Sequence, residues 1–393
     1  MNLSRPLVIV AALALSACTW QRLNAFQQTQ LGGYKFDLVD SSNQQVEFLL
    51  SPKLSDDGAI AYRTFNFDSS SAIYFSDGGA PQKIIGSDYV YGSRRIDLIN
   101  VKIDMNNSHV IAFSTSYIGA IDSAVFGVFT LTPQGTLTRV STNDPSTYFN
   151  SLAVSINDSN NLAYLGSASS YADVYATTPA GPVRIFRGGD FNRSPTDPEI
   201  NSSALITFAG DNSNAGSPGD LFVYSNGQMT KIDSGQAGDN NRIVKPGLND
   251  AGQIAYDRQT SINSYELKLF ESGQSAVLPV DNVVGSRVEL NNVGVIGFYG
   301  RNANNTNGIR TYAQGAINDV LGIGDNLFGK QIQSVGVWDI NDRNQLALTA
   351  TFTDGSSAIL IATPVPEPTS VGLLISAMAI ALFASRVRCL NRA

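Results

Sequence analysis

A nine-residue motif that recurs along the chain constrains the fold of this 393-residue protein more than any other feature. One clear copy reads Leu248-Asn-Asp-Ala-Gly-Gln-Ile-Ala-Tyr256. The copies begin at Leu54, Met105, Ile156, Ile200, Leu248, Leu290 and Ile340, so the starts are 51, 51, 44, 48, 42 and 50 residues apart. A period of this length predicts a repeat architecture in which each unit forms one supersecondary element.

The polar positions of the motif predict a tight turn. Its second and third positions carry mainly Asn, Asp and Ser, whose short side chains bond to the backbone and initiate turns. The fifth position is filled by Gly58, His109, Asn160, Ala204, Gly252, Gly294 and Asn344. Gly, Asn and His tolerate a positive φ, so this position predicts a left-handed turn residue. Ala204 is the exception, and it predicts a relaxed or different turn in the fourth copy.

The residues after the turn predict strands. Each copy continues with a large apolar, a small and then usually an aromatic residue, as in Ile60-Ala61-Tyr62, and alternation with period two is typical of a strand. A second strand follows in each unit, and hairpin signals such as Ser225-Asn226-Gly227-Gln228 introduce a third. A fourth, such as residues 95–103, leads into the next copy. Four antiparallel strands per unit are typical of a propeller blade.

We therefore predict an all-β chain whose residues 34–362 form a seven-bladed β-propeller. The seventh unit ends after its second strand, while residues 34–39 and 46–50 supply two strands before the first copy. Two N-terminal and two C-terminal strands would complete the last blade and close the ring without an open edge. This complementarity favours a closed propeller over an open solenoid or a row of stacked sandwiches.

The composition excludes several classes of function. The chain has 33 acidic and 26 basic residues and no basic block, which argues against nucleic acid as a partner. Its two cysteines, Cys18 and Cys389, lie outside the repeats, so neither a disulfide framework nor a cysteine-ligated metal is expected there. The one histidine, His109, falls at the left-handed turn position, which explains it without catalysis. We predict no catalytic residue, no metal and no cofactor.

Acidic residues near the motif are the remaining candidates for chemistry. One set precedes the motif copies and could face a central channel, where paired carboxylates hydrolyse glycosides: Asp97, Asp104, Glu199, Glu289 and Asp339. The simpler interpretation is that they are solvated strand ends. A second set could supply oxygen ligands to calcium, but it lacks the spacing of a calcium loop: Asp56, Asp57, Asp211, Asp220, Asp239 and Asp325.

The N-terminus predicts export. Residues 1–18 carry Arg5, then an apolar run over residues 7–15 and then small residues, which is the order of a secretory signal peptide. The segment Leu15-Ser16-Ala17-Cys18 resembles the lipobox of bacterial lipoproteins. That resemblance implies that Cys18 becomes the lipidated first residue of the mature chain. Ordinary cleavage after Ala17 is the alternative.

The C-terminus predicts a membrane-associated sorting tail over residues 363–393. Val365-Pro366-Glu367-Pro368 leads into an apolar run over residues 371–384, and Arg386 and Arg388 follow. About 20 apolar residues are needed to cross the hydrocarbon core, so this run predicts a short transmembrane helix that needs Ser385 or thinned lipid. The basic end fits the cytoplasmic side.

This tail resembles a PEP-CTERM sorting signal. The resemblance implies a Gram-negative-type bacterium, recognition by an exosortase, and delivery to the cell surface or an extracellular polymer matrix. A plain C-terminal anchor is the alternative. The repeats over residues 54–361 also resemble the Asn-x-x-Gly-x-x-Ala-Phe tandem repeat of bacterial surface proteins with varied C-terminal anchors, with matches that begin at Asn157, Asn249 and Asn291. The glycine position is broken in four copies, and the resemblance implies no chemistry for individual residues.

Together these features predict an exported, membrane-attached propeller without enzymatic activity. Its role would be structural or adhesive, at the cell surface or in an exopolysaccharide matrix, with an extracellular polysaccharide or another surface protein as partner. The alternative is a secreted propeller hydrolase or lyase that acts on polysaccharide.

Overall fold

The computed structural model describes residues 27–43, 47–96, 98–116, 127–141, 153–166, 172–188, 195, 197–211, 219–234, 243, 245–261, 264–285, 287–302 and 304–366. The predicted signal peptide with Cys18, and the sorting tail from Glu367 with Pro368, Arg386 and Arg388, lie outside these residues. In the part of the chain that is described, no helix is long and apolar enough to span a membrane.

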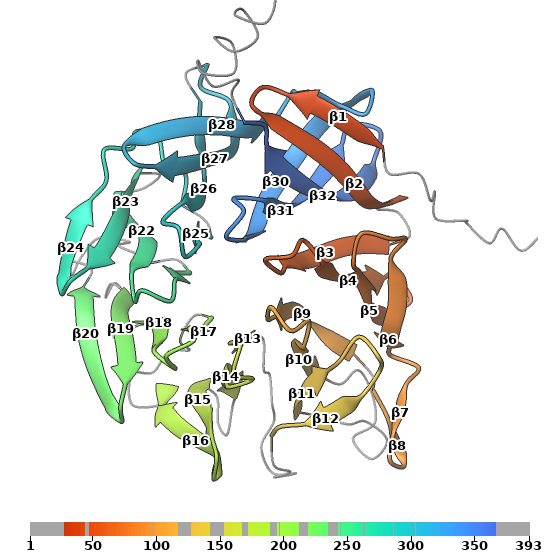
Figure 1. The fold of residues 1–393 in the computed structure, drawn as a ribbon, viewed down its shortest axis with the longest axis vertical. Coiled ribbons are helices and arrows are strands. Elements are labelled where there is room, and N and C mark those ends of the chain that lie inside the picture. Colours follow the sequence, from red (N-terminus) through yellow and green to blue (C-terminus); the bar gives the residue numbers. More distant parts are fainter. Residues whose placement is uncertain are drawn as a thin grey trace, which may run out of the picture.

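The described chain forms seven antiparallel sheets arranged around one axis (Figure 1), which confirms the predicted seven-bladed β-propeller. The six four-stranded blades contain β3 (Glu47–Leu54), β4 (Ile60–Asn66), β5 (Ser71–Ser76), β6 (Gln82–Gly86); β9 (Leu98–Met105), β10 (Ile111–Ser116), β11 (Gly127–Leu131), β12 (Leu137–Arg139); β13 (Val154–Ile156), β14 (Leu162–Gly166), β15 (Asp173–Thr178), β16 (Gly181–Phe186); β17 (Glu199–Ile200), β18 (Ile206–Asp211), β19 (Gly219–Ser225), β20 (Gln228–Ser234); β21 (Gly247–Leu248), β22 (Ile254–Ser261), β23 (Ser264–Glu271), β24 (Gln274–Val277); and β25 (Glu289–Leu290), β26 (Ile296–Arg301), β27 (Asn307–Ala313), β28 (Ala316–Gly322). A short hairpin of β7 (Val90–Tyr91) and β8 (Arg94–Arg95) separates the first two blades.

Each copy of the motif forms the turn between the innermost and the second strand of a blade. We call these seven turns the repeat turns. In the second blade, for example, β9 ends at Met105, the turn follows, and β10 begins at Ile111 as its antiparallel partner. The predicted fourth strand of each unit is therefore the innermost strand of the next blade, so the sequence repeat and the blade are offset by one strand.

The backbone at the fifth motif position is left-handed in all seven copies, with φ between 59° and 93°. Ala204, at 59°, shares this conformation, so the expectation of a different turn in the fourth copy is wrong. The reason is that Asn201 holds the turn: its carbonyl accepts the Ala204 amide at 2.9 Å, and its Oδ1 accepts the Leu205 amide at 2.9 Å. These bonds offset the local backbone strain of a non-glycine residue.

The N-terminal and C-terminal strands close the ring in the seventh blade, as predicted. Its strand order is β1 (Gln28–Leu31), β2 (Tyr34–Asn43), β32 (Ser356–Pro364), β31 (Leu346–Phe352), β30 (Lys330–Ile340) and β29 (Asn326–Leu327). Strands β2 and β32 are antiparallel, with Phe36 opposite Ala362 and Leu38 opposite Leu360. The assignment of residues 46–50 to this blade is wrong. Residues 47–50 begin β3, which leads into the first repeat turn as the innermost strand of the first blade. In the seventh blade, β1 is the outermost strand instead.

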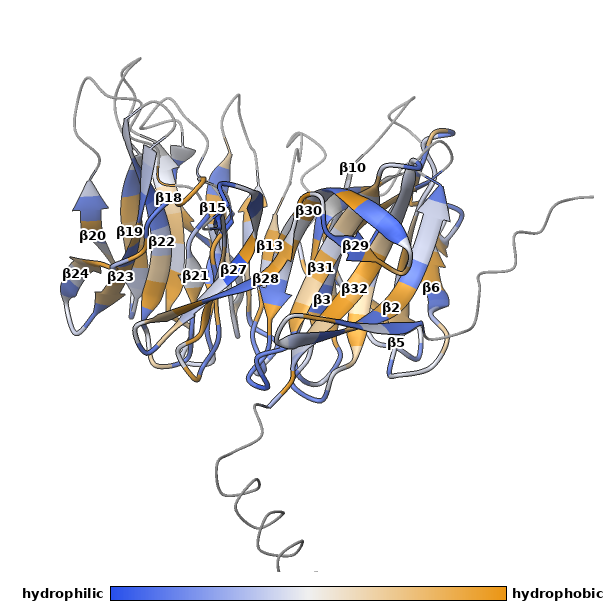
Figure 2. Ribbon diagram, turned by 90° about the horizontal axis from the view of Figure 1, so that it is seen from above, coloured by the Kyte–Doolittle hydropathy of each residue, from blue (hydrophilic) through white to orange (hydrophobic). Residues whose placement is uncertain are grey.

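The hydrophobic core lies between neighbouring blades. Ile73 of the first blade packs in one cluster with Ile103 and Phe113 of the second, and similar clusters join the other blades. Figure 2 shows the ring edge-on, with apolar and polar segments alternating along the strands. Because the apolar side chains are used between the blades, polar side chains of the innermost strands are left to line the axis.

The last described residues leave the ring on the face that carries the repeat turns. Leu346, which follows the seventh repeat turn, is opposite Ala362, and Pro364 continues past it to pair with Tyr34. The Val365 amide then donates to the Gly33 carbonyl at 2.8 Å. The chain exit and the repeat turns therefore share one face of the propeller.

Candidate functional site

The third motif residues form an outer ring around the axis, which we call the mouth ring. It consists of Asp56, Asn107, Asp158, Ser202, Asp250, Asn292 and Asp342, all at least partly exposed. At six of the seven steps, the backbone amide of one member donates to Oδ1 of the next at 2.7–2.8 Å. The step from Asp158 to Ser202 lacks this bond because serine has no Oδ1 atom. The ring thus carries four carboxylates on a hydrogen-bonded frame.

A second ring, formed by the second motif residues, is buried beneath the mouth ring. In this Asn ring, six asparagine Nδ2 groups each donate to the backbone carbonyl of the next copy at 2.8–3.2 Å: Asn106, Asn157, Asn201, Asn249, Asn291 and Asn341. The seventh position is Ser55, which has no amide to donate. These links join neighbouring blades, so the Asn ring stabilises the propeller and leaves little capacity for a ligand.

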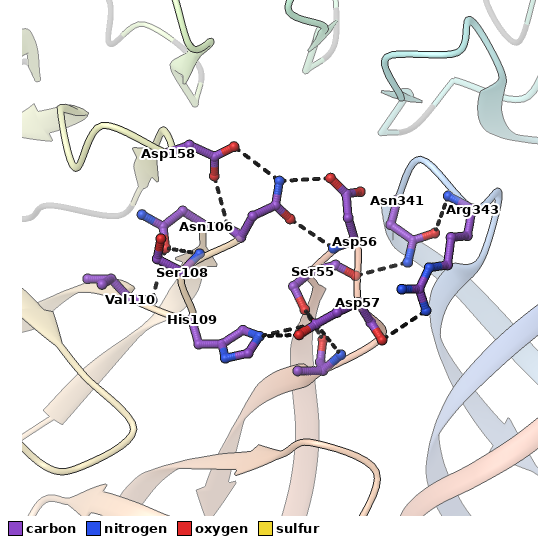
Figure 3. Close-up of polar contacts among 12 residues, drawn as sticks. Ser55, Asp56, Asp57, Asn106, Ser108, His109, Val110, Asp158, Asn341 and Arg343 are labelled. Atoms are coloured by element: carbon purple, nitrogen blue, oxygen red, sulfur yellow. Dashed lines mark hydrogen bonds and ion pairs between the residues drawn. The ribbon is translucent and has the colours of Figure 1, made fainter.

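The boundary between the first and second blades, where the Asn link is missing, is held by a different contact (Figure 3). His109 Nε2 lies 3.0 Å from Asp57 Oδ2, and the Ser55 hydroxyl donates to Asp57 Oδ1 at 2.5 Å. Burial alone would raise the pKa of Asp57, but the hydrogen bonds from Ser55 and His109 lower it to about 2. His109 therefore has a structural partner at the turn position that the sequence predicted.

The residue that precedes each motif copy faces the axis below the Asn ring. This charged layer consists of Lys53, Asp104, Ser155, Glu199, Gly247, Glu289 and Asp339, which line one cavity. Lys53 lies 3.2 Å from Asp104 and 3.5 Å from Asp339, and so bridges the blades on either side of its own. The structure thus brings Asp104, Glu199, Glu289 and Asp339 to the channel, as predicted, whereas Asp97 lies outside the described residues.

Two residues earlier along the chain, in four of the copies, a deeper layer is mainly cationic: Lys102, Asp197, Lys245 and Arg287. Lys245 lies 2.5 Å from Glu199 and 3.6 Å from Glu289. Lys102 forms an ion pair with Asp197 from a blade two positions away. None of these four residues was predicted as part of the site. The signal was present as a charged residue three positions before each of four motif copies.

The buried charges shift one another's protonation. Burial, together with Glu289 and Asp104, raises the pKa of Asp339 to about 6 although Lys53 opposes the shift. Burial would also raise the pKa of Glu199, but Lys245 and other cations lower it to about 2. Burial and the charges of Lys245 and Arg287 lower the pKa of Lys102 well below its usual value. Two carboxyls of one cavity thus differ strongly in proton affinity.

The mouth ring, the Asn ring and the charged layer enclose a cavity of about 160 Å³ that opens at the repeat turns. Eight carboxylates and one lysine line it, and none of the lining residues is aromatic. Within the described part of the chain, no three His, Cys, Asp or Glu side chains converge closely enough to hold a metal ion. Asp239, one of the calcium candidates, lies outside that part. The arrangement is suited to attract a cationic group rather than to ligate a metal directly.

Comparison with known proteins supports the fold alone. No protein-family model matches the chain. The search of curated proteins finds no match. Among solved structures, the β-propeller domain of the Trilobed protease from Pyrococcus furiosus is similar at a TM-score of 0.55 and 9% identity, over 83% of this chain and 99% of that one.

Two further solved structures resemble this chain at the same low sequence identity. A Mycobacterium tuberculosis puromycin-hydrolyzing peptidase has a TM-score of 0.51 and 9% identity, over 79% of this chain and 52% of the peptidase, so this chain spans about half its length. A chain of the mitotic checkpoint complex has a TM-score of 0.50 and 9% identity, over 91% of this chain and 98% of that one. Proteins of such different roles share the architecture, so the function must be argued from the site.

Proposed function

We propose that this protein is an exported β-propeller with a structural or adhesive binding role at the cell surface or in an extracellular matrix. In this proposal an exosortase recognises the tail through Val365, Pro366, Glu367 and Pro368, and Cys18 carries a lipid. The observation that carries the binding role is the axial cavity. Its walls are rings that hold the blades together. The one histidine, His109, is not part of the cavity lining, and its Nε2 contacts the Asp57 carboxylate.

The position of the chain exit supports processing of the tail. The cavity opens on the face from which the chain leaves at Pro364. A retained membrane helix would hold this acidic face near the lipid surface, where anionic headgroups repel carboxylates. Removal of the tail would free the cavity for a partner in the matrix, either a polysaccharide or another surface protein.

Mass spectrometry of the mature protein from its native cells tests sorting. We expect a lipidated Cys18 and a mass that lacks residues 386–393. An intact C-terminus would refute processing, and an unmodified Cys18 would refute lipidation. Cell fractionation tests location: recovery of the mature protein in the cytoplasm instead of the envelope or matrix would overturn the proposed role.

An enzyme acting on polysaccharide is the second candidate, and one observation favours it. Asp339 and Glu199 line the same cavity with pKa values of about 6 and about 2, and a split of this kind is typical of an acid paired with an ionised carboxylate. Turnover on a panel of glycans is the test. Turnover that Asp339→Asn abolishes would establish the enzyme and contradict a pure binding role.

A further inference from the structure

The negative charge of the axial cavity is only partly compensated. Its lining includes Lys53 as the single cation against eight carboxylates. The cations of the deeper layer approach only the floor, where Lys245 contacts Glu199 and Glu289. Asp56, Asp158, Asp250 and Asp342 have no cation of their own in the mouth ring, so the field of the entrance favours a positive ligand.

Glu289 gives a second and independent indication of a ligand. Its side chain is 8% exposed and lines the cavity, and its buried Oε1 accepts no hydrogen bond. Arg287 Nε, at 3.3 Å, and Lys245 Nζ, at 3.6 Å, approach this oxygen without a hydrogen bond. A buried carboxylate oxygen without a hydrogen bond is costly. Glu289 lines the cavity, so a donor that enters the cavity can reach its carboxylate and compensate this deficit.

The shape and lining of the cavity limit the kind of cation. A directly ligated metal is disfavoured because no three acidic groups converge in the described chain. The lining has no aromatic ring on which a sugar, a guanidinium or a quaternary ammonium could stack. The volume of about 160 Å³ has room for a few waters or a small polar group. A primary ammonium on a flexible stem is compact, well hydrated and carries three donors, so it fits this space.

We propose that the axial cavity binds the ammonium group of a lysine side chain presented by a protein partner. This inference rests on the proposed binding role and gives its partner a chemistry. The mouth ring attracts and orients the cation, and the Glu289 carboxylate accepts a hydrogen bond from the ammonium or from a water that it carries.

The test uses the purified full-length protein and a tetralysine peptide with blocked termini, with binding measured by isothermal titration calorimetry. The matched peptide has every lysine acetylated. The variant Asp158→Asn/Asp250→Asn removes two mouth charges, and it should fold because Asn107 and Asn292 already occupy this motif position. The variant Asp68→Asn/Asp354→Asn is the control. It changes the net charge equally at strand turns on the opposite face.

We expect tetralysine to bind, the acetylated peptide not to bind, and the mouth variant to bind at least about tenfold more weakly, while the control variant changes affinity less than about twofold. Equal binding by the two variants would overturn the proposal, as would the absence of tetralysine binding to the folded wild-type protein. A glucosamine tetramer that binds when tetralysine does not would assign the cavity to an amino-sugar polymer and refute the protein partner. Calcium binding without tetralysine binding would refute the ammonium site. Each of these failures leaves the fractionation result, and so the proposed location, untouched.

Discussion

The Asn ring and the charged layer lie two residues apart along the chain in every copy, yet they differ in how regularly they repeat. Six of seven positions in the Asn ring carry the same residue and make the same bond to the next blade. In the charged layer, the corresponding positions carry Lys53, Asp104, Ser155, Glu199, Gly247, Glu289 and Asp339. The repeated tier performs one structural task in every blade. The unrepeated tier gives the cavity an asymmetric charge pattern, which is what a specific site requires.

The largest effect should follow from removing one Asn link. Asn291 donates to the Asn341 carbonyl and to Asn344 Oδ1, both at 2.8 Å, and accepts the Val295 amide at 2.8 Å. Asn291→Ala leaves these buried groups without partners, so we expect the free energy of unfolding to fall by roughly 2–4 kcal/mol. Urea denaturation of the variant gives this value.

Ser55→Ala is the matched control, because Ser55 occupies the same ring position without an amide link to the second blade. It loses hydroxyl bonds to Asp57 and to the Ala59 carbonyl, so we expect a cost of roughly 1 kcal/mol. Equal losses in the two variants would contradict the structural role assigned to the Asn ring.

In the charged layer, Asp339→Asn should have a smaller effect that depends on pH. The pKa of Asp339 is raised from 3.8 to about 6, so the folded state binds more protons than the unfolded state between these values. The stability that this group contributes is complete below pH 3.8 and is lost as the pH rises through about 6. We expect the wild type to lose roughly 2 kcal/mol relative to the variant between pH 4 and pH 7.

Urea denaturation of both proteins over that pH range measures this difference. Asp68→Asn, which removes an exposed acid on the opposite face, is the control. The wild type should not lose stability relative to this variant as the pH rises. A wild type that gains stability relative to Asp339→Asn as the pH rises would show that Lys53 dominates over burial, contrary to the account of the charged layer.

The smallest effect concerns the fourth repeat turn, which carries Asn201 of the Asn ring. Ala204 adopts a φ of 59°, a conformation that costs a non-glycine residue about 1–2 kcal/mol. Ala204→Gly should therefore stabilise the protein by roughly 0.5–1 kcal/mol after the entropy of glycine in the unfolded chain is subtracted. Thermal unfolding checks this, and Asn160→Gly should gain less because Asn tolerates this region. A destabilised Ala204→Gly would mean that the fourth turn is not left-handed.

Most of the fold could be predicted from the sequence because seven copies of one motif show which residue types each position of the turn accepts. A column of Gly, Asn and His has one simple explanation, and it indicated the left-handed turn even where Ala204 departs from it. The strand that joins one unit to the next was harder to assign. Residues 46–50 have the apolar pattern of any strand, and only the pairing of β3 with β4 shows that residues 47–50 begin the first blade.

The candidate site was predicted in part. Asp104, Glu199, Glu289 and Asp339 were expected at the channel because they precede motif copies, but their cationic partners were not. Lys102 and Asp197 form an ion pair although 95 residues separate them in the sequence, and they come from blades that are not neighbours. A contact of that kind depends on the closed ring, so no local pattern reveals it.

The Asn ring and the charged layer both cross the boundary between the seventh and the first blade, where Asn341 bonds to Ser55 and Lys53 pairs with Asp339. Closure of the ring is therefore the central claim. Asp37 is opposite Ile361 on β2 and β32, at the spacing of about 4.5–5.5 Å that a disulfide accepts. In the full chain with Cys18→Ser and Cys389→Ser, Asp37→Cys/Ile361→Cys should therefore form a disulfide under mild oxidation, as judged by mass spectrometry of a non-reduced digest. Asp37→Cys/Ile359→Cys, two residues out of register, should not. A cross-link confined to the out-of-register pair, or absent from both, would contradict a propeller closed by its first and last strands.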